Sequence, residues 1–283
     1  MLRILCLLAL LRAVPVFADA TLLGSFHWVV SDPNFGGFSA IELTPDGDSF
    51  IALTDRGFIA QGKITRHGSA IAGIEVKTLR RLLGPTRAPL ADAFSDSEGL
   101  AIGPDGTLHI SFEGEHGIRS FAAMDQPGSH LIASPTFADF QLNASLEALA
   151  IGPDGVLYTV PERSGLAIRP FPVFRLKSGV WDQPFEIPRR GSFLISGADI
   201  GPDGRLYILE RDFAGIGFRS RVRRFDLDGS GEEVILETRL RTHDNLEGIS
   251  IWQDADGLRM TLISDDNFRA FQRTEIVEYR LTD

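Results

Sequence analysis

Residues 98–106 read EGLAIGPDG, and residues 147–155 read EALAIGPDG. Two further copies, SAIELTPDG at residues 39–47 and GADIGPDG at residues 197–204, keep the Pro-Asp-Gly tripeptide. A looser fifth copy, EGISIWQDADG, occupies residues 247–257. In each copy one short apolar run enters a turn and another leaves it. This pattern indicates a β-hairpin, because proline fixes φ at the turn and glycine accepts a positive φ.

The spacing of the copies indicates the size of the repeating unit. The prolines of the four closest copies, at positions 45, 104, 153 and 202, lie 59, 49 and 49 residues apart. A unit of this length has room for about four short strands, as in one propeller blade. No long stretch has apolar residues at helical spacing, which argues against a helical repeat. We therefore predict an all-β fold, a single β-propeller of five four-stranded blades, with six blades as the alternative.

The two ends of the chain are expected to close the ring. Residues 22–30 (LLGSFHWVV) resemble a strand without a turn of its own, and residues 275–281 (EIVEYRL) resemble another. Pairing of both segments in the last blade would leave no open sheet edge. No linker divides the repeats, so one domain is expected over residues 21–283.

The first twenty residues have the three parts of a secretory signal. A basic start at Arg3 precedes a largely apolar run over residues 4–14 and the small-residue end Ala18-Asp19-Ala20. We predict a signal peptide over residues 1–20, and a periplasmic or secreted protein. The apolar run is too short to span a bilayer, so no membrane insertion is expected after the signal is removed.

The overall charge restricts the partners of the chain. The formal net charge is −10 at pH 7, which argues against binding to nucleic acid, because phosphates repel an acidic surface. Such a surface is compatible with a metal cation. The single cysteine, Cys6, lies in the predicted signal, so no disulfide is expected in the remaining chain.

Carboxylates recur at the hairpin ends opposite the Pro-Asp-Gly turns. Glu98 precedes the second turn by about as many residues as Glu113 follows it, and the two ends of a hairpin lie side by side. Blades one and four keep only the outgoing acid. Eight acids are thus expected to converge on one mouth of the central channel: Asp55, Glu98, Glu113, Glu147, Glu162, Glu210, Glu247 and Asp265.

Crowded carboxylates repel one another, and a bound cation is the simplest remedy. Hard oxygen ligands, without cysteine and with few histidines, favour calcium. The predicted calcium ligands are Asp55, Glu98, Glu147, Glu247, Asp265 and Asn267. The alternative is that arginines of neighbouring blades neutralise the acids in structural ion pairs.

Other residues near the same mouth could carry the chemistry of a reaction. The candidate bases are Glu113, Glu162 and Glu210. His116 and His243 are candidate proton-transfer groups. Three arginines directly follow acids of the hairpin ends and are candidates for holding an anionic substrate: Arg56, Arg163 and Arg211.

Three motifs resemble a known family. EGLA at residues 98–101, NLEGI at residues 245–249 and SDDNF at residues 264–268 are similar to the phytase-like family named for "esterase-like activity of phytase". The resemblance implies a secreted or periplasmic propeller, related in architecture to calcium-dependent phytases and lactonase-like hydrolases. The absence of a lysine-rich mouth argues against phytate itself as substrate.

These observations lead to one functional prediction and two alternatives. We predict a calcium-assisted hydrolase of small phosphate or carboxylic esters, with its active site at the acidic mouth. The alternatives are a non-catalytic propeller that binds a ligand or protein around a structural calcium, and a lactonase-type hydrolase.

Overall fold

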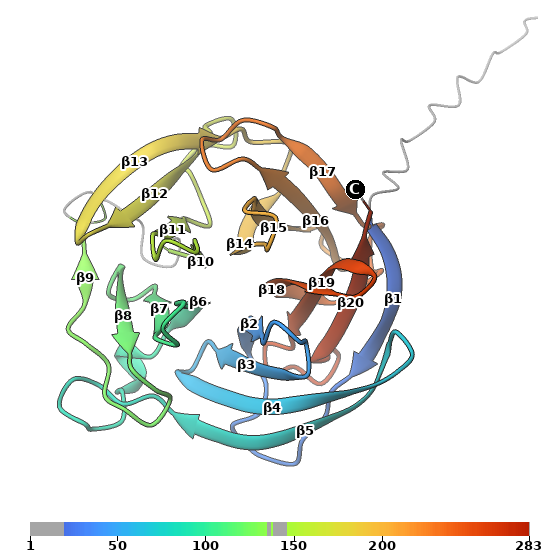
Figure 1. The fold of residues 1–283 in the computed structure, drawn as a ribbon, viewed down its shortest axis with the longest axis horizontal. Coiled ribbons are helices and arrows are strands. Elements are labelled where there is room, and N and C mark those ends of the chain that lie inside the picture. Colours follow the sequence, from blue (N-terminus) through green and yellow to red (C-terminus); the bar gives the residue numbers. More distant parts are fainter. Residues whose placement is uncertain (1–19, 135–136, 138–145, 283) are drawn as a thin grey trace, which may run out of the picture.

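The computed structural model describes residues 20–134, 137 and 146–282. Five antiparallel sheets of four strands each are arranged in a ring, as Figure 1 shows. The innermost strand of every sheet borders the centre of the ring, and the outermost strand lies at its periphery. The predicted five-bladed propeller is confirmed, and the alternative of six blades is excluded.

The blades follow the chain in order, from the inner strand to the outer one. Blade I contains β2 (Phe38–Leu43), β3 (Ser49–Thr54), β4 (Phe58–His67) and β5 (Ala70–Arg81). Blade II contains β6 (Ser97–Ile102), β7 (Leu108–Phe112), β8 (Gly117–Phe121) and β9 (Ile132–Ala133), preceded by the 3₁₀ helix η1 (Asp92–Phe94). Blade III contains β10 (Ala148–Ile151), β11 (Leu157–Val160), β12 (Phe171–Lys177) and β13 (Val180–Ile187). Blade IV contains β14 (Leu194–Ile200), β15 (Leu206–Phe213), β16 (Phe218–Phe225) and β17 (Glu233–Glu237).

Blade V joins the two ends of the chain. It contains β18 (Asn245–Asp254), β19 (Gly257–Asp265), β20 (Glu275–Leu281) and, as its outer strand, β1 (Ala20–His27). Ala20 lies opposite Leu281 in this pairing, so the predicted closure of the ring by its terminal strands is confirmed. Residues 1–19 of the predicted signal peptide lie outside the described residues, and the signal peptide stays a prediction. None of the described residues forms a helix long and apolar enough to cross a membrane.

The hydrophobic core lies between the blades. Five clusters of buried side chains each contain residues of two neighbouring sheets. Trp28, just after β1, stacks on Phe38 of β2 with ring centroids 4.9 Å apart. Burial of both faces of the inner strands explains why these strands are apolar runs and not alternating sequences.

The Pro-Asp-Gly turns have the local structure expected of them. Gly106 and Gly155 adopt positive φ values of 84° and 76°, which glycine accepts without steric cost. Asp105 Oδ1 accepts a hydrogen bond of 3.0 Å from the backbone N–H of Thr107, two residues further on. These aspartates are therefore turn formers, and they lie away from the acids at the other ends of the hairpins.

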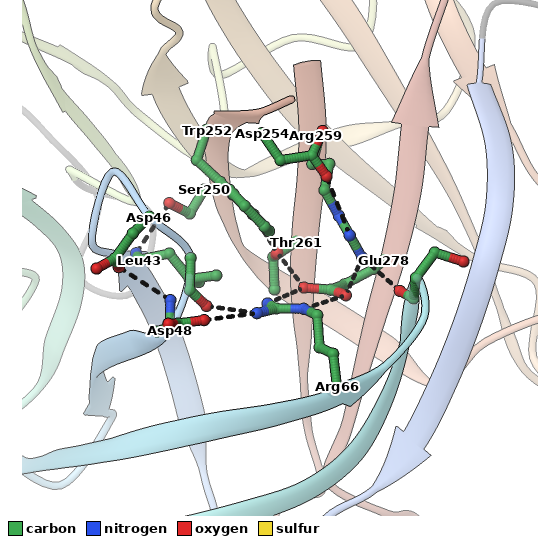
Figure 2. Close-up of polar contacts among 12 residues, drawn as sticks. Leu43, Asp46, Asp48, Arg66, Ser250, Trp252, Asp254, Arg259, Thr261 and Glu278 are labelled. Atoms are coloured by element: carbon green, nitrogen blue, oxygen red, sulfur yellow. Dashed lines mark hydrogen bonds and ion pairs between the residues drawn. The ribbon is translucent and has the colours of Figure 1, made fainter. Parts of the chain in front are cut away.

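Blades I and V are joined by a buried ion-pair network, shown in Figure 2. Glu278 on β20 accepts hydrogen bonds from Arg66 Nη2 on β4 (2.6 Å) and from Arg259 Nη2 on β19 (2.5 Å). Thr261 Oγ1 donates to Glu278 (3.1 Å) and accepts from Trp252 Nε1 (2.9 Å). We call Arg66, Arg259, Thr261 and Glu278 the seam network. Its buried carboxylate lies between two guanidinium groups, which also pair at their outer sides with Asp254 and Asp48.

Candidate functional site

The inner strands aim their acids by local irregularities. The register between β18 and β19 pairs Leu246 with Ser264 and then Gly248 with Ile263, so Glu247 falls in a β-bulge. The pairing of β6 with β7 skips Glu98 in the same way. A bulge turns the extra residue out of the ladder and re-aims its side chain. Both glutamates reach the mouth by this device.

Three carboxyl groups of blade II form a compact group. Carboxylate oxygens of Asp96, Glu98 and Glu113 lie within 4.8 Å of one another. Burial raises the pKa of Asp96, and its interactions with the Glu98 and Glu113 side chains oppose this shift. Burial, followed by the charges of Glu147 and Asp96, also raises the pKa of Glu98. All the donors are hard oxygens, which suits calcium.

The sequence prediction missed Asp96. It stands two residues before Glu98, and Asn245 stands two residues before Glu247 in blade V. Aligning the blades at these glutamates would have found Asp96, because a polar side chain recurs at that position.

Acids of blades I and V extend the group. Burial, and then the charge of Asp265, raises the pKa of Asp55 to about 7. Burial also raises the pKa of Asp265 to about 6. Asp55 Oδ1 is buried and has no hydrogen-bond partner among the described residues. A Cβ on Gly37 would collide with Asp55 Oδ1 and the Phe268 ring, so the site requires glycine there.

Arg211 lies at the centre of the opposite half of the mouth. Its Nη1 donates to Glu247 and to Asn245 Oδ1 (3.2 Å). Its Nη2 donates to Glu162 Oε1 (3.2 Å) and to Glu147 Oε1 (3.4 Å). Burial still raises the pKa of Glu147 to about 8, although the charge of Arg211 lowers it. One guanidinium thus contacts carboxylates of blades III and V.

Seven of the eight predicted acids therefore gather at one end of the channel, joined by Asp96. Among the described residues, Arg211 is the one largely buried guanidinium bonded to them. We call the following eight residues the acid cluster: Asp55, Asp96, Glu98, Glu113, Glu147, Glu162, Glu247 and Asp265.

The prediction that Glu210 joins the mouth as a candidate base is wrong. Its side chain is fully buried and accepts from Arg221 Nε (2.6 Å) and from Arg223 Nε (2.9 Å) and Nη2 (2.6 Å). Side chains alternate along a strand, so β15 directs Arg211 to the acid cluster and Glu210 to the arginines of β16. Glu210 is an internal counter-ion of blade IV.

The other two predicted substrate-binding arginines lie at the rim. The Arg56 guanidinium lies 3.4 Å from the centroid of the Phe268 ring and is exposed. Arg163 Nε donates to Glu162 Oε2 (2.7 Å), with about half of its side chain exposed. Both cations remain accessible to a ligand at the mouth.

The two predicted histidines occupy different surroundings. His116 lies in the turn after Glu113, with a φ of 49°, and its N–H donates to the Glu113 carbonyl (3.2 Å). His243 is buried, with Nε2 2.6 Å from Tyr279 Oη and Nδ1 3.8 Å from Glu275 Oε1. Burial lowers the pKa of His243, which favours the neutral imidazole. Tyr279 is a partner that the sequence prediction missed.

A cleft of about 890 Å³ adjoins the acid cluster on the side of Arg211. Arg211, Asn245 and Glu162 line both the cleft and the cluster. Asn267, a predicted calcium ligand, is exposed and lines the cleft, and its backbone N–H donates to Asp265 Oδ1 (2.6 Å).

Comparisons with known proteins identify the family. The model of the family described as "Phytase-like: Esterase-like activity of phytase" matches residues 33–268. The chain belongs to this family. The match confirms the predicted resemblance and includes every residue of the acid cluster. A search of curated proteins gives no match.

Several solved propellers have a similar architecture. Virginiamycin B lyase from Staphylococcus aureus is 16% identical, with a TM-score of 0.45 over 94% of this chain and 75% of that one. Regucalcin from Agrobacterium tumefaciens, a calcium-binding protein, is 10% identical, with a TM-score of 0.49 over 87% and 91%. A structure described as a putative gluconolactonase is 14% identical, with a TM-score of 0.46 over 94% of both chains. At these levels the likenesses carry no functional argument.

Proposed function

We propose that this chain is an exported, calcium-assisted hydrolase of small carboxylic or phosphate esters, with its active site at the acid cluster. One observation carries the proposal: among the described residues, eight carboxyl groups converge on the mouth, and one largely buried guanidinium is bonded to them. Such an excess of acids is costly in a folded protein unless a ligand offsets it. The family description supports esters as the substrate class.

Calcium would be held by the half of the cluster that Arg211 does not reach. Asp96, Glu98 and Glu113 supply oxygens close enough to share one ion. Asp55 contributes a buried oxygen without a hydrogen-bond partner among the described residues. Asp265 is close enough for its charge to raise the pKa of Asp55. When bound, the ion would neutralise the acids, polarise the ester oxygen and favour ionisation of a water.

The remaining residues have roles that follow from their positions. In hydrolysis, the water oxygen bonds to the acyl carbon or phosphorus, and the bond to the leaving oxygen breaks. One carboxylate takes the proton of the water, and one carboxylic acid gives a proton to the leaving oxygen. Glu147 and Glu162 lie between the calcium ligands and the cleft, and we assign these proton transfers to them. Arg211 would hold the anionic oxygen of the substrate.

Export and the class of partner also belong to the proposal. The signal-like pattern of residues 1–20 supports a periplasmic or secreted location. The net charge of −10 supports a small molecule, and not nucleic acid, as the partner.

The test is an assay of the purified chain with calcium or with chelator. The substrates are generic aryl esters, aryl phosphates and lactones. We expect calcium-dependent turnover of an ester and a fall of about 100-fold or more in Glu98→Gln. The matched control is Glu75→Gln, an exposed acid on the outer strand β5, which should keep full turnover.

Three outcomes would contradict the proposal. Absence of turnover on all three substrate classes, together with a calcium-dependent melting temperature, would indicate a binding propeller with structural calcium. A melting temperature that calcium does not raise would refute the metal site, because a ligand of the native state must stabilise it. Turnover of lactones alone would indicate the lactonase-type alternative.

A further inference from the structure

The cleft beside Arg211 differs in charge from the rest of the protein. Five arginines line it, against three carboxylates, although the chain as a whole carries a formal charge of −10. The carboxylates already have partners: Glu162 accepts from Arg163 and Arg211, and Asp212 accepts from Arg219 Nε (2.7 Å). Asp244 accepts from the backbone N–H of Arg273 (3.0 Å). The five arginines of the cleft are Arg163, Arg211, Arg241, Arg269 and Arg273.

Two of these arginines have donors to spare. Within the part of the chain that the structure describes, the other three cleft arginines pair with carboxylates, whereas no carboxylate lies within 4.0 Å of the guanidinium of Arg241 or Arg269. Both residues are exposed. A guanidinium presents five donors in a planar fork that matches a carboxylate or a phosphate.

Arg241 is held in place by the backbone around it. Its φ is 64°, in the left-handed region that non-glycine residues rarely adopt, and its N–H donates to the Phe218 carbonyl (2.7 Å). A Cβ on Gly217 would collide with Arg241 Cγ, so the missing side chain at Gly217 leaves room for the arginine. Such backbone strain is concentrated at functional sites.

The same cleft exposes large apolar side chains. Phe213, Ile216 and Phe271 line it with exposed fractions of 60%, 71% and 81%. The first two come from an extension of the β15–β16 hairpin, which continues its pairing from Glu210 out to Phe213 opposite Phe218. Apolar surface next to cations without a carboxylate partner suits a ligand that combines an apolar group with an anionic group.

We propose that this cleft binds the non-reacting part of the substrate, and that this part joins an apolar group to an anionic carboxylate or phosphate. The inference rests on the proposed function, because Arg211 places the cleft next to the reacting bond. The natural substrate is then an amphiphilic anion, and a neutral ester binds less tightly. Arg241 and Arg269 recognise the anion, and Phe213 and Phe271 contact the apolar group.

The test compares ligands that differ only in the anion. Binding of 4-hydroxybenzoate, phenol and phenyl phosphate is measured by calorimetry with calcium or with chelator. Turnover is measured for 4-acetoxybenzoate, phenyl acetate and phenyl phosphate. We expect 4-hydroxybenzoate to bind more tightly than phenol by about tenfold, in chelator as well as in calcium, which corresponds to one charge-assisted hydrogen bond. The phenyl phosphate arm shows which of the two anions the cleft prefers.

Variants assign the effect to the cleft. Arg241→Gln and Arg269→Gln should each remove most of the preference for the anion, whereas Arg80→Gln, on the outer strand β5, should leave it intact. Phe271→Ser should weaken binding of both ligands about threefold, whereas Val180→Ser, at the exposed start of β13 in blade III, should not.

The outcomes separate this inference from the proposed function. Equal binding of 4-hydroxybenzoate and phenol, or a preference that survives both arginine variants, would overturn the cleft assignment. A preference that appears only with calcium would assign the anion to the acid cluster instead. Selective binding without turnover of 4-acetoxybenzoate, phenyl acetate or phenyl phosphate would leave the cleft standing and refute the hydrolase.

Discussion

The seam network and the acid cluster are both groups of buried charges on the same ring, but they differ in how many of their carboxylates have a cationic partner. In the seam network Glu278 lies between Arg66 and Arg259, and Thr261 donates to it as well. In the acid cluster, Arg211 pairs with three of the eight carboxyl groups, Glu147, Glu162 and Glu247. Glu210, between Arg221 and Arg223, belongs to the first kind. Charges that hold blades together are neutralised within the protein, whereas the cluster keeps an excess for a ligand.

The largest effect is expected from the seam network. Glu278→Gln removes the buried carboxylate that Arg66 and Arg259 share and leaves them only the more exposed Asp48 and Asp254. Breaking a buried ion pair in this way costs about 3–5 kcal/mol of unfolding free energy. Urea unfolding measures the loss. Glu233→Gln is the control, because this glutamate is 45% exposed and pairs with arginines at the surface. A loss no larger than that of the control would show that the seam network does not hold the ring closed.

The next effect separates the two halves of the mouth. Arg211→Gln removes the cation that Glu147, Glu162 and Glu247 share, and we expect a loss of about 2 kcal/mol in chelator. Calcium should restore part of the loss, because it neutralises neighbouring acids. Urea unfolding with and without calcium measures both quantities. An equal loss in the two conditions would mean that the halves are electrostatically independent.

A smaller effect concerns pH. Folding raises the pKa of Asp55 to about 7 and of Glu147 to about 8, so the folded state binds more protons than the unfolded state between pH 4 and 8. The unfolding free energy in chelator should therefore fall as pH rises through this window, by on the order of 1 kcal/mol or more. Saturating calcium should flatten the slope. An unfolding free energy that rises from pH 5 to pH 8 in chelator would contradict the excess of negative charge in the acid cluster.

The smallest effect has the opposite sign to that of the seam variant. Glu147→Gln removes a carboxyl group whose ionisation burial disfavours, so we expect a gain below about 1 kcal/mol at pH 8 in chelator. Thermal unfolding at pH 5 and pH 8 measures the difference. A loss at pH 8 as large as that of Glu278→Gln would show that both networks are structural.

The sequence predicted the fold well because every blade repeats one local rule. Alternating turns and apolar runs specify hairpins, and their period specifies the blade. The bulges at Glu98 and Glu247 were not predicted, because the sequence pattern does not distinguish a bulged residue from a paired one.

The candidate site was predicted in part. Acids at the two ends of one hairpin must lie together, and on that basis Glu98 and Glu113 were placed correctly. Glu210 was placed wrongly because adjacent side chains of β15 face opposite sides, and the sequence does not show whether Glu210 or Arg211 faces the channel. The cleft was not predicted at all. Its side chains come from the extended end of β15, as Phe213 does, and from loops, as Arg241 and Phe271 do, and the repeat sets no positions there.

The closure of the ring also determines when the strands of blade V can pair during synthesis of the chain. β1 is the first described strand to be synthesised, and its partner β20 is the last. Until β20 exists, β1 is an unpaired edge, and blade V cannot form. Pairing of β1 with β20 is the most non-local strand pairing among the described residues, and contacts of this kind slow folding and lengthen exposure to aggregation. Among the described strands, β1 is thus made first but can pair only after β20, the last, has been made.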